Sequence, residues 1–143
     1  MKATTRSRYV LRASFALAKL EEEGTPVSVN RIAEEENIPS VLLDQLFFML
    51  KKAGIVTSVR GPEGGVCFAR PPDALTLKDL LDAAGEDLDF TDSGKPQPED
   101  APRIGERLSR EVWAGLTDLI KGYFGGITLA AVLEKENSPG NSG

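Results

Sequence analysis

Apolar side chains recur every three or four positions over residues 6–22, which predicts an amphipathic helix. Gly24-Thr25-Pro26 ends it, since glycine and proline together break the helical pattern. Ser28 then has the position and side chain of an N-cap for a second helix over 29–36, which Asn37 closes. The chain therefore begins with two helices separated by a short turn.

A third helix is predicted from Pro39-Ser40 to Ala53, with Gly54 as the residue just beyond its C-terminus. The turn that joins it to the preceding helix spans only residues 36–40. Two helices joined by a turn of this length predict a helix-turn-helix, in which the second helix is the recognition helix.

The apolar period changes directly after this pair of helices. Residues 55–60 and 66–70 have the alternation and β-branched content of strands, and the five residues 61–65, rich in glycine with one proline, join them. A basic hairpin that follows a helix-turn-helix is the wing of a winged-helix DNA-binding domain. The predicted fold class is mainly α with a small β-hairpin.

The second half returns to helical spacing. Thr76 is a predicted N-cap with Asp79 three residues later, whereas residues 85–105 lack any period. A long helix is predicted from near Arg107 to Gly125-Gly126, and a short one over 129–133. The long helix carries more apolar surface than one helix hides, which predicts dimerisation through Val112, Trp113, Leu116, Leu119, Ile120 and Tyr123.

The expected organisation is a winged helix-turn-helix over residues 1–72, then a helix, an acidic loop and a long dimerisation helix over 73–133, with a flexible tail over 134–143. Charge divides the chain in the same way. Residues 1–70 carry 10 Lys and Arg against 8 Asp and Glu, whereas residues 71–143 carry 7 against 14. The net charge of −5 therefore hides a mildly basic first half, which suits contact with DNA phosphates.

Composition excludes several other classes of protein. The chain has no histidine, one cysteine, and no nucleophile–base pair or phosphate-binding loop, so an enzyme is not expected. A single cysteine allows no intramolecular disulfide and suggests a reducing compartment. No apolar stretch reaches the roughly 18 residues of a membrane span, and no signal-peptide core follows the N-terminus. We expect a cytoplasmic protein with no membrane partner.

The candidate DNA contacts start at the N-terminus of the recognition helix. The amide of Gln45 pairs well with adenine, the carboxylate of Asp44 can accept from a cytosine amino group, and Val41 can touch a thymine methyl. Arg60, at the wing turn, has the charge that a narrow minor groove attracts. Gly64-Gly65 permits a thin turn that lets the backbone approach phosphate.

Several motifs together resemble the Rrf-type winged helix-turn-helix transcriptional regulators. They include Leu43-Asp44-Gln45-Leu46, Leu50-Lys51-Lys52-Ala53-Gly54 and Val59-Arg60-Gly61-Pro62-Glu63-Gly64-Gly65, and the match extends over about residues 1–133. The resemblance implies a homodimeric repressor on double-stranded DNA with a palindromic operator. With the residue-based candidates, the predicted DNA-binding set is Lys2, Thr5, Arg6, Arg8, Ser28, Pro39, Ser40, Val41, Leu42, Asp44, Gln45, Arg60, Gly61, Gly64 and Gly65.

The sequence departs from this family in the loop before the long helix. Cluster-binding members carry three cysteines there, whereas residues 85–105 have none, and Ser93 stands where the first would be. The hydroxyl of Ser93 and the carboxylates of Asp92, Glu99 and Asp100 are poor ligands for an iron–sulfur cluster. We therefore expect no cofactor and no metal site.

Two alternatives remain open at this level. The chain could be a protein-interaction module that works through its acidic half, or a redox- or metal-responsive sensor that uses the acidic loop or Cys67. If Cys67 has no chemical role, we expect a buried, inert thiol on the second wing strand. An effector, either a small molecule or a protein, is also left open by the sequence.

Overall fold

The computed structural model describes residues 4–91 and 103–137. The elements in chain order are α1 (Thr5–Leu20), α2 (Val29–Glu36), α3 (Ser40–Lys52), β1 (Val56–Val59), β2 (Gly65–Phe68), a short 3-10 turn η1 (Pro72–Ala74), α4 (Leu77–Ala83), α5 (Ile104–Gly125) and α6 (Leu129–Asn137). This order confirms the mainly helical fold with one small hairpin. None of the helices in these two ranges is long and apolar enough to cross a membrane.

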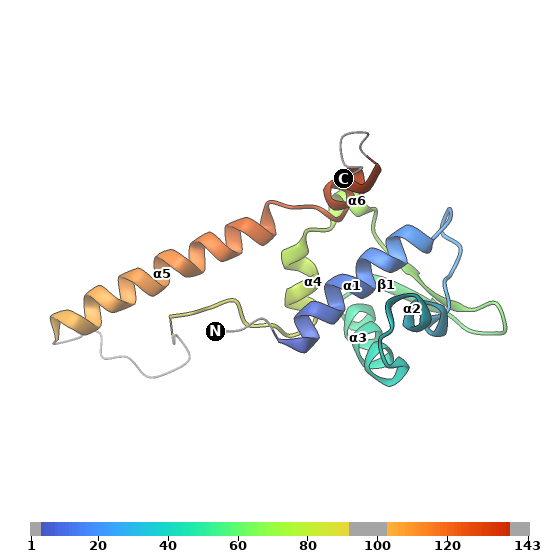
Figure 1. The fold of residues 1–143 in the computed structure, drawn as a ribbon, viewed down its shortest axis with the longest axis horizontal. Coiled ribbons are helices and arrows are strands. Elements are labelled where there is room, and N and C mark those ends of the chain that lie inside the picture. Colours follow the sequence, from blue (N-terminus) through green and yellow to red (C-terminus); the bar gives the residue numbers. More distant parts are fainter. Residues whose placement is uncertain (1–3, 92–102, 138–143) are drawn as a thin grey trace.

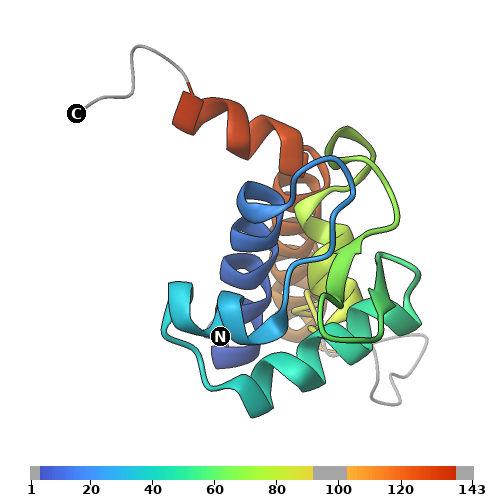
Figure 2. The same cartoon turned by 90° about the vertical axis from the view of Figure 1, so that its right-hand side faces the viewer.

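The helix-turn-helix is built from local capping. The Oγ of Ser28 accepts the backbone N–H of Arg31 at 3.1 Å, which satisfies an otherwise unpaired donor in the first turn of α2. Asn37 ends α2 in the left-handed region with φ of 53°. These two features confirm the predicted start and end of α2, and they set the direction in which α3 leaves. Figure 2 shows α3 lying across one end of α1.

The hairpin is attached to the helices at two points. Val56 pairs with Phe68 and Val59 with Gly65 in its antiparallel register. The backbone groups of Val27, just before α2, exchange two hydrogen bonds of 2.9 Å with Val66. In addition, the carboxylate of Glu21 at the end of α1 accepts the N–H of Phe68 at 2.7 Å. The wing is therefore fixed relative to α1 and α2.

One hydrophobic core joins the two halves of the chain. Fully buried side chains from α1 to α3, such as Leu17, Ile32 and Leu50, belong to the same cluster as Leu80 and Leu129. Each buried aliphatic side chain of this size contributes roughly 1.5–3 kcal/mol relative to an exposed one. The elements on either side of residue 72 thus stabilise one another.

The predicted capping box of α4 is present. The Oγ1 of Thr76 accepts the N–H of Asp79 at 3.1 Å, and the Asp79 carboxylate accepts the N–H of Thr76 at 2.9 Å. The hydroxyl of Thr128 caps α6 in turn by accepting the N–H of Ala131 at 3.0 Å. However, α6 continues to Asn137, so the predicted end of this helix at residue 133 was wrong. Residues 138–143 lie outside the described residues.

Helix α5 projects from the body as a long arm (Figure 1). It begins at Ile104, earlier than the predicted start near Arg107, and its 22 residues span about 33 Å. Thr117 is its only buried residue, and the Thr117 hydroxyl accepts the N–H of Phe90 at 2.9 Å. Most of the arm therefore has no cover from the rest of the described chain.

Candidate nucleic-acid interface

Helix α3 divides sharply into a buried and an exposed face. Leu43, Leu46, Phe47 and Leu50 point into the core. The other face carries the exposed side chains of Ser40, Val41, Leu42, Asp44, Gln45, Phe48, Lys51 and Lys52. All predicted contacts of the recognition helix are thus accessible, and two cations stand at its C-terminal end.

A groove of about 250 Å³ lies between the start of α1 and the exposed side of α3. Thr5 and Arg6 line it from α1, and Leu42 and Gln45 line it from α3. The fold therefore brings together four predicted DNA-binding residues from sequence segments about forty residues apart. The start of α1 and the exposed side of α3 thus border the same groove.

Glu86, just after α4, holds the start of α1. Its Oε1 accepts hydrogen bonds from the hydroxyl of Thr4 and from the Nε of Arg6, the latter at 3.2 Å. The Glu86 side chain is nearly buried, whereas half of the Arg6 side chain is exposed. Arg6 is therefore oriented by a carboxylate on one side while its other guanidinium nitrogens remain available for a phosphate.

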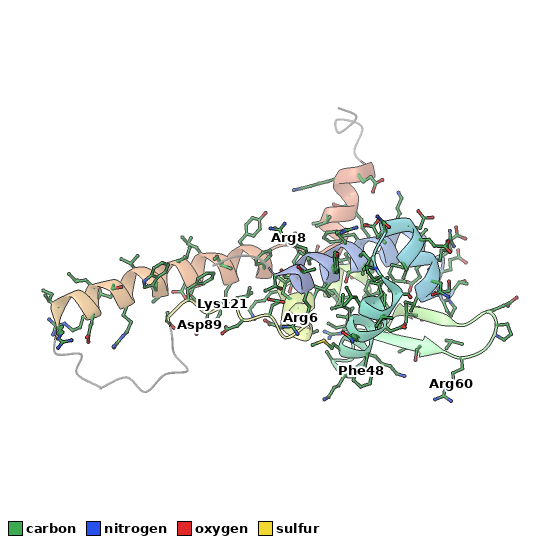
Figure 3. The ribbon with its side chains drawn as sticks, turned by 60° about the horizontal axis from the view of Figure 1, so that its bottom comes forward. Arg6, Arg8, Phe48, Arg60, Asp89 and Lys121 are labelled. Carbon is green, nitrogen blue, oxygen red and sulfur yellow. The ribbon has the colours of Figure 1, made fainter. Side chains whose placement is uncertain are left out.

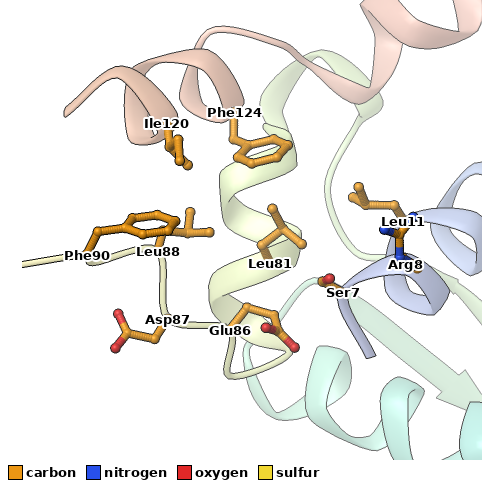
Figure 4. A pocket seen from close by; sticks show the side chains of 10 residues that line it. All are labelled: Ser7, Arg8, Leu11, Leu81, Glu86, Asp87, Leu88, Phe90, Ile120 and Phe124. Atoms are coloured by element: carbon orange, nitrogen blue, oxygen red, sulfur yellow. The ribbon is translucent and has the colours of Figure 1, made fainter. Parts of the chain in front are cut away.

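Arg8 lies away from this groove. It lines a separate pocket of about 370 Å³ whose other walls come from Leu11 of α1, Leu81 of α4, Leu88 and Phe90 after α4, and Ile120 and Phe124 of α5 (Figure 4). In Figure 3, Arg8 is on the opposite edge of the molecule from Phe48 and Arg60. The structure thus separates Arg8 from the other predicted phosphate contacts that it describes.

The wing places Arg60 at the start of its turn, exposed and on the same side of the molecule as Phe48 (Figure 3). Gly61 has a φ of +111°, and its carbonyl accepts the N–H of Gly64 at 3.0 Å, which closes the turn. A Cβ on Gly64 would lie 2.0 Å from the carbonyl oxygen of Val59, and one on Gly65 2.2 Å from that of Val27. Both glycines are therefore required for close backbone packing within the protein.

The remaining predicted contacts fall into three groups. Pro39 is exposed beside the start of α3, where a DNA contact is accessible. The hydroxyl of Ser28 is the N-cap of α2, which gives it a structural role whether or not it meets DNA. Lys2 lies outside the described residues, as do Asp92, Ser93, Glu99 and Asp100 of the acidic loop.

Cys67 is half-buried on β2, whereas an inert thiol was expected to be fully buried. Its Sγ lies 3.2 Å from the hydroxyl oxygen of Thr57, its cross-strand partner. Among the described residues no three His, Cys, Asp or Glu side chains come together as a metal site.

Four of the six predicted dimerisation residues on α5 are exposed, namely Val112, Trp113, Leu119 and Tyr123. Leu116 and Ile120 are half-buried, and Ile120 faces the pocket of its own protomer (Figure 4). Ile104 and Leu108 extend the exposed apolar surface toward the N-terminal end of the arm.

The sequence-based predictions missed two residues of this region. Phe48 lies on the exposed face of α3. Helical spacing could have identified it, because it is seven residues after Val41 and four after Asp44 and therefore lies on their face. No sequence pattern could have identified Glu86, because its contacts with Thr4 and Arg6 join residues about eighty positions apart.

A helix-turn-helix with an exposed recognition face, followed by a basic wing fixed beside it, defines the chain as a winged helix-turn-helix DNA-binding protein. The chain belongs to the Rrf2 family, described as iron-dependent transcriptional regulators, whose model matches residues 3–135. This confirms the resemblance drawn from the wing and recognition-helix motifs.

Individual relatives agree with this assignment. The chain is 34% identical to the HTH-type transcriptional regulator IscR of Erwinia tasmaniensis over 137 residues, covering 95% of this chain and 81% of that protein. Among solved structures, T. potens IscR has a TM-score of 0.75 with 30% identity, covering 95% of this chain and 88% of the other. CymR, the global cysteine regulator of B. subtilis, has a TM-score of 0.74 with 31% identity, covering 92% and 95%.

The chain is therefore a DNA-binding transcriptional regulator and not an enzyme. The iron dependence in the family description does not fit the residues present. Iron–sulfur clusters are held by several thiolates, whereas this chain has one cysteine, engaged in the wing, and no histidine. The candidate site of this protein is the DNA-facing surface rather than a metal centre.

Proposed function

We propose that the protein is a homodimeric repressor that binds a palindromic operator without an iron–sulfur cluster. In each protomer, α3 enters the major groove and Arg60 reaches the adjacent minor groove, while Thr5 and Arg6 hold a phosphate at the start of α1. Gln45 and Asp44 read base edges from the first turns of α3.

The uncovered apolar face of α5 carries the proposal of a dimer. Ile104, Leu108, Val112, Leu119 and Tyr123 are each more than half exposed. Their spacing of four, four, seven and four residues keeps them within one stripe about 100° wide. Such a stripe on a projecting arm is costly in water and is covered when two arms pack together about a two-fold axis.

The dimer explains how a small domain obtains operator specificity. Two α3 helices related by a two-fold axis would enter successive major grooves about 34 Å apart, so that the operator repeats the same half-site with inverted orientation. Because the chain lacks cluster ligands, we propose that DNA binding responds to a small molecule or a protein partner rather than to bound iron.

The oligomeric state tests this proposal directly. Light scattering on the wild-type protein should give twice the mass of one chain, and Leu119→Asp should give a single chain because a carboxylate would be buried in the apolar seam. Asp118→Ala, an adjacent change that leaves the apolar stripe intact, is the matched control. Footprinting should then show two inverted half-sites with the wild type; a monomeric wild type, or protection of one half-site only, would contradict the proposal.

A further inference from the structure

Phe48 presents a large apolar group on the face of α3 that is directed at DNA. Its side chain is 67% exposed, although the neighbouring Phe47 is buried in the core. Isolated apolar side chains are common on protein surfaces, but Phe48 is not isolated. Val41 is 66% exposed on the same face, and Gln45 lies between the two.

The geometry of an α-helix aligns these three residues. Residues seven positions apart differ by only about 20° around the axis, and they are separated by about 10.5 Å along it. Val41 and Phe48 thus form two apolar contacts on one line, with the amide of Gln45 between them. Projected on the DNA axis, this separation is at most about three base-pair steps of 3.4 Å each.

The positive charges near Phe48 favour DNA as the partner of its side chain. Lys51 and Lys52 follow it on α3, and Arg60 of the wing points to the same side of the molecule (Figure 3). Cations that flank an apolar group on this face suit the major groove, where phosphates border the base edges. The apolar feature that the major groove offers is the C5 methyl of thymine.

We propose that Phe48 reads a thymine methyl group in the operator, within about three base pairs of a thymine contacted by Val41. This inference rests on the proposed docking of α3 in the major groove. It adds a specificity residue beyond the first turns of α3, where the polar contacts of Asp44 and Gln45 lie.

The test uses the full-length protein and the duplex that the wild type enriches most strongly from a random-sequence library. Each thymine of that duplex is replaced in turn by deoxyuridine, which removes only the methyl group, and by 5-bromodeoxyuridine, which restores a group of similar size. We expect about fourfold weaker binding by the wild type when the methyl group at the Phe48 position is removed, and recovery with bromine.

Phe48→Ala should bind the unmodified duplex at least fourfold more weakly and should lose its sensitivity to deoxyuridine at that one thymine. Val41→Ala is the matched control, because it should abolish sensitivity at a different thymine within about three base pairs. Circular dichroism of both variants should match the wild type, since both side chains are mostly exposed.

Two results would overturn the inference while DNA binding stands. One is equal sensitivity to deoxyuridine in wild type and Phe48→Ala at every thymine, which would place Phe48 against sugar or phosphate instead. The other is a wild-type operator in which no thymine depends on Phe48. If the library yields no enriched duplex at all, the proposed function fails, and the inference fails with it.

Discussion

The Nε of Arg6 donates to the carboxylate of Glu86 at 3.2 Å, across a separation of 80 residues. This contact joins the start of α1 to the segment that leads from α4 toward the arm. Thr4, the N-cap of α1, donates to the same carboxylate oxygen. One side chain after α4 therefore holds both the N-cap of α1 and a predicted DNA contact.

Replacing Glu86 by Gln should strengthen non-specific DNA binding. The amide keeps an acceptor for Thr4 but removes the negative charge that competes with phosphate for Arg6. We expect tighter binding to random duplex DNA at low salt, and a slope of log K against log salt steeper by up to about 0.9, the effect of one more neutralised phosphate. The slope is measured by titration at several salt concentrations.

The control for Glu86→Gln is the double variant with Arg6→Ala, which should return the slope to the wild-type value or below. The loss of a half-exposed ion pair should cost only about 0–1 kcal/mol in the free energy of unfolding. An unchanged salt slope in Glu86→Gln would show that Arg6 neutralises no additional phosphate when the charge of Glu86 is removed.

Arg60→Ala should weaken operator binding by about 1–3 kcal/mol without affecting folding, because the side chain is exposed at the start of the wing turn. Arg70→Ala, an exposed arginine beyond the end of β2, is the comparison that should have a smaller effect. Gel-shift titration with the selected operator measures both. Equal affinities of wild type and Arg60→Ala would remove the minor-groove role.

Gly65→Ala should destabilise the wing, because the added Cβ would meet the carbonyl oxygen of Val27 at 2.2 Å. Overpacking of this kind costs about 1–3 kcal/mol, and the two hydrogen bonds between Val27 and Val66 would be strained. Chemical denaturation should show the loss of stability. Glu63→Ala, exposed in the same turn, is the control and should change the unfolding free energy by less than about 0.5 kcal/mol.

Cys67→Ser should leave operator affinity unchanged under both oxidising and reducing conditions. The serine hydroxyl can replace the contact that the thiol makes with Thr57 at 3.2 Å. Affinity is measured with and without a mild oxidant for both proteins. Inhibition of the wild type by oxidant, absent from Cys67→Ser, would revive the redox-sensor alternative that the sequence left open.

The order of the elements and most of their ends could be predicted from the pattern of residues along the chain. The caps at Ser28 and Thr76, and the left-handed Asn37, depend on residues three or four positions apart, so that local hydrogen bonding specifies them. The helical and alternating periods likewise identified α3 and the wing. The face of α3 that contains Val41, Asp44 and Gln45 follows from the same spacing.

Which of these residues share a surface depends instead on contacts between distant parts of the chain. Arg6 and Arg8 point about 160° apart on α1, as helix geometry requires. Packing then places α3 beside Arg6 and α5 beside Arg8, so that only Arg6 lines the groove with the recognition helix. Packing of α4 on α1 places Glu86 beside Thr4 and Arg6. Lys19 of α1 and Glu136 of α6 likewise come within 3.9 Å as an ion pair between distant parts of the sequence. Short-range hydrogen bonds and hydrophobic periodicity depend on residues close together in the sequence. The long-range contacts form only when the shared core has packed the helices side by side.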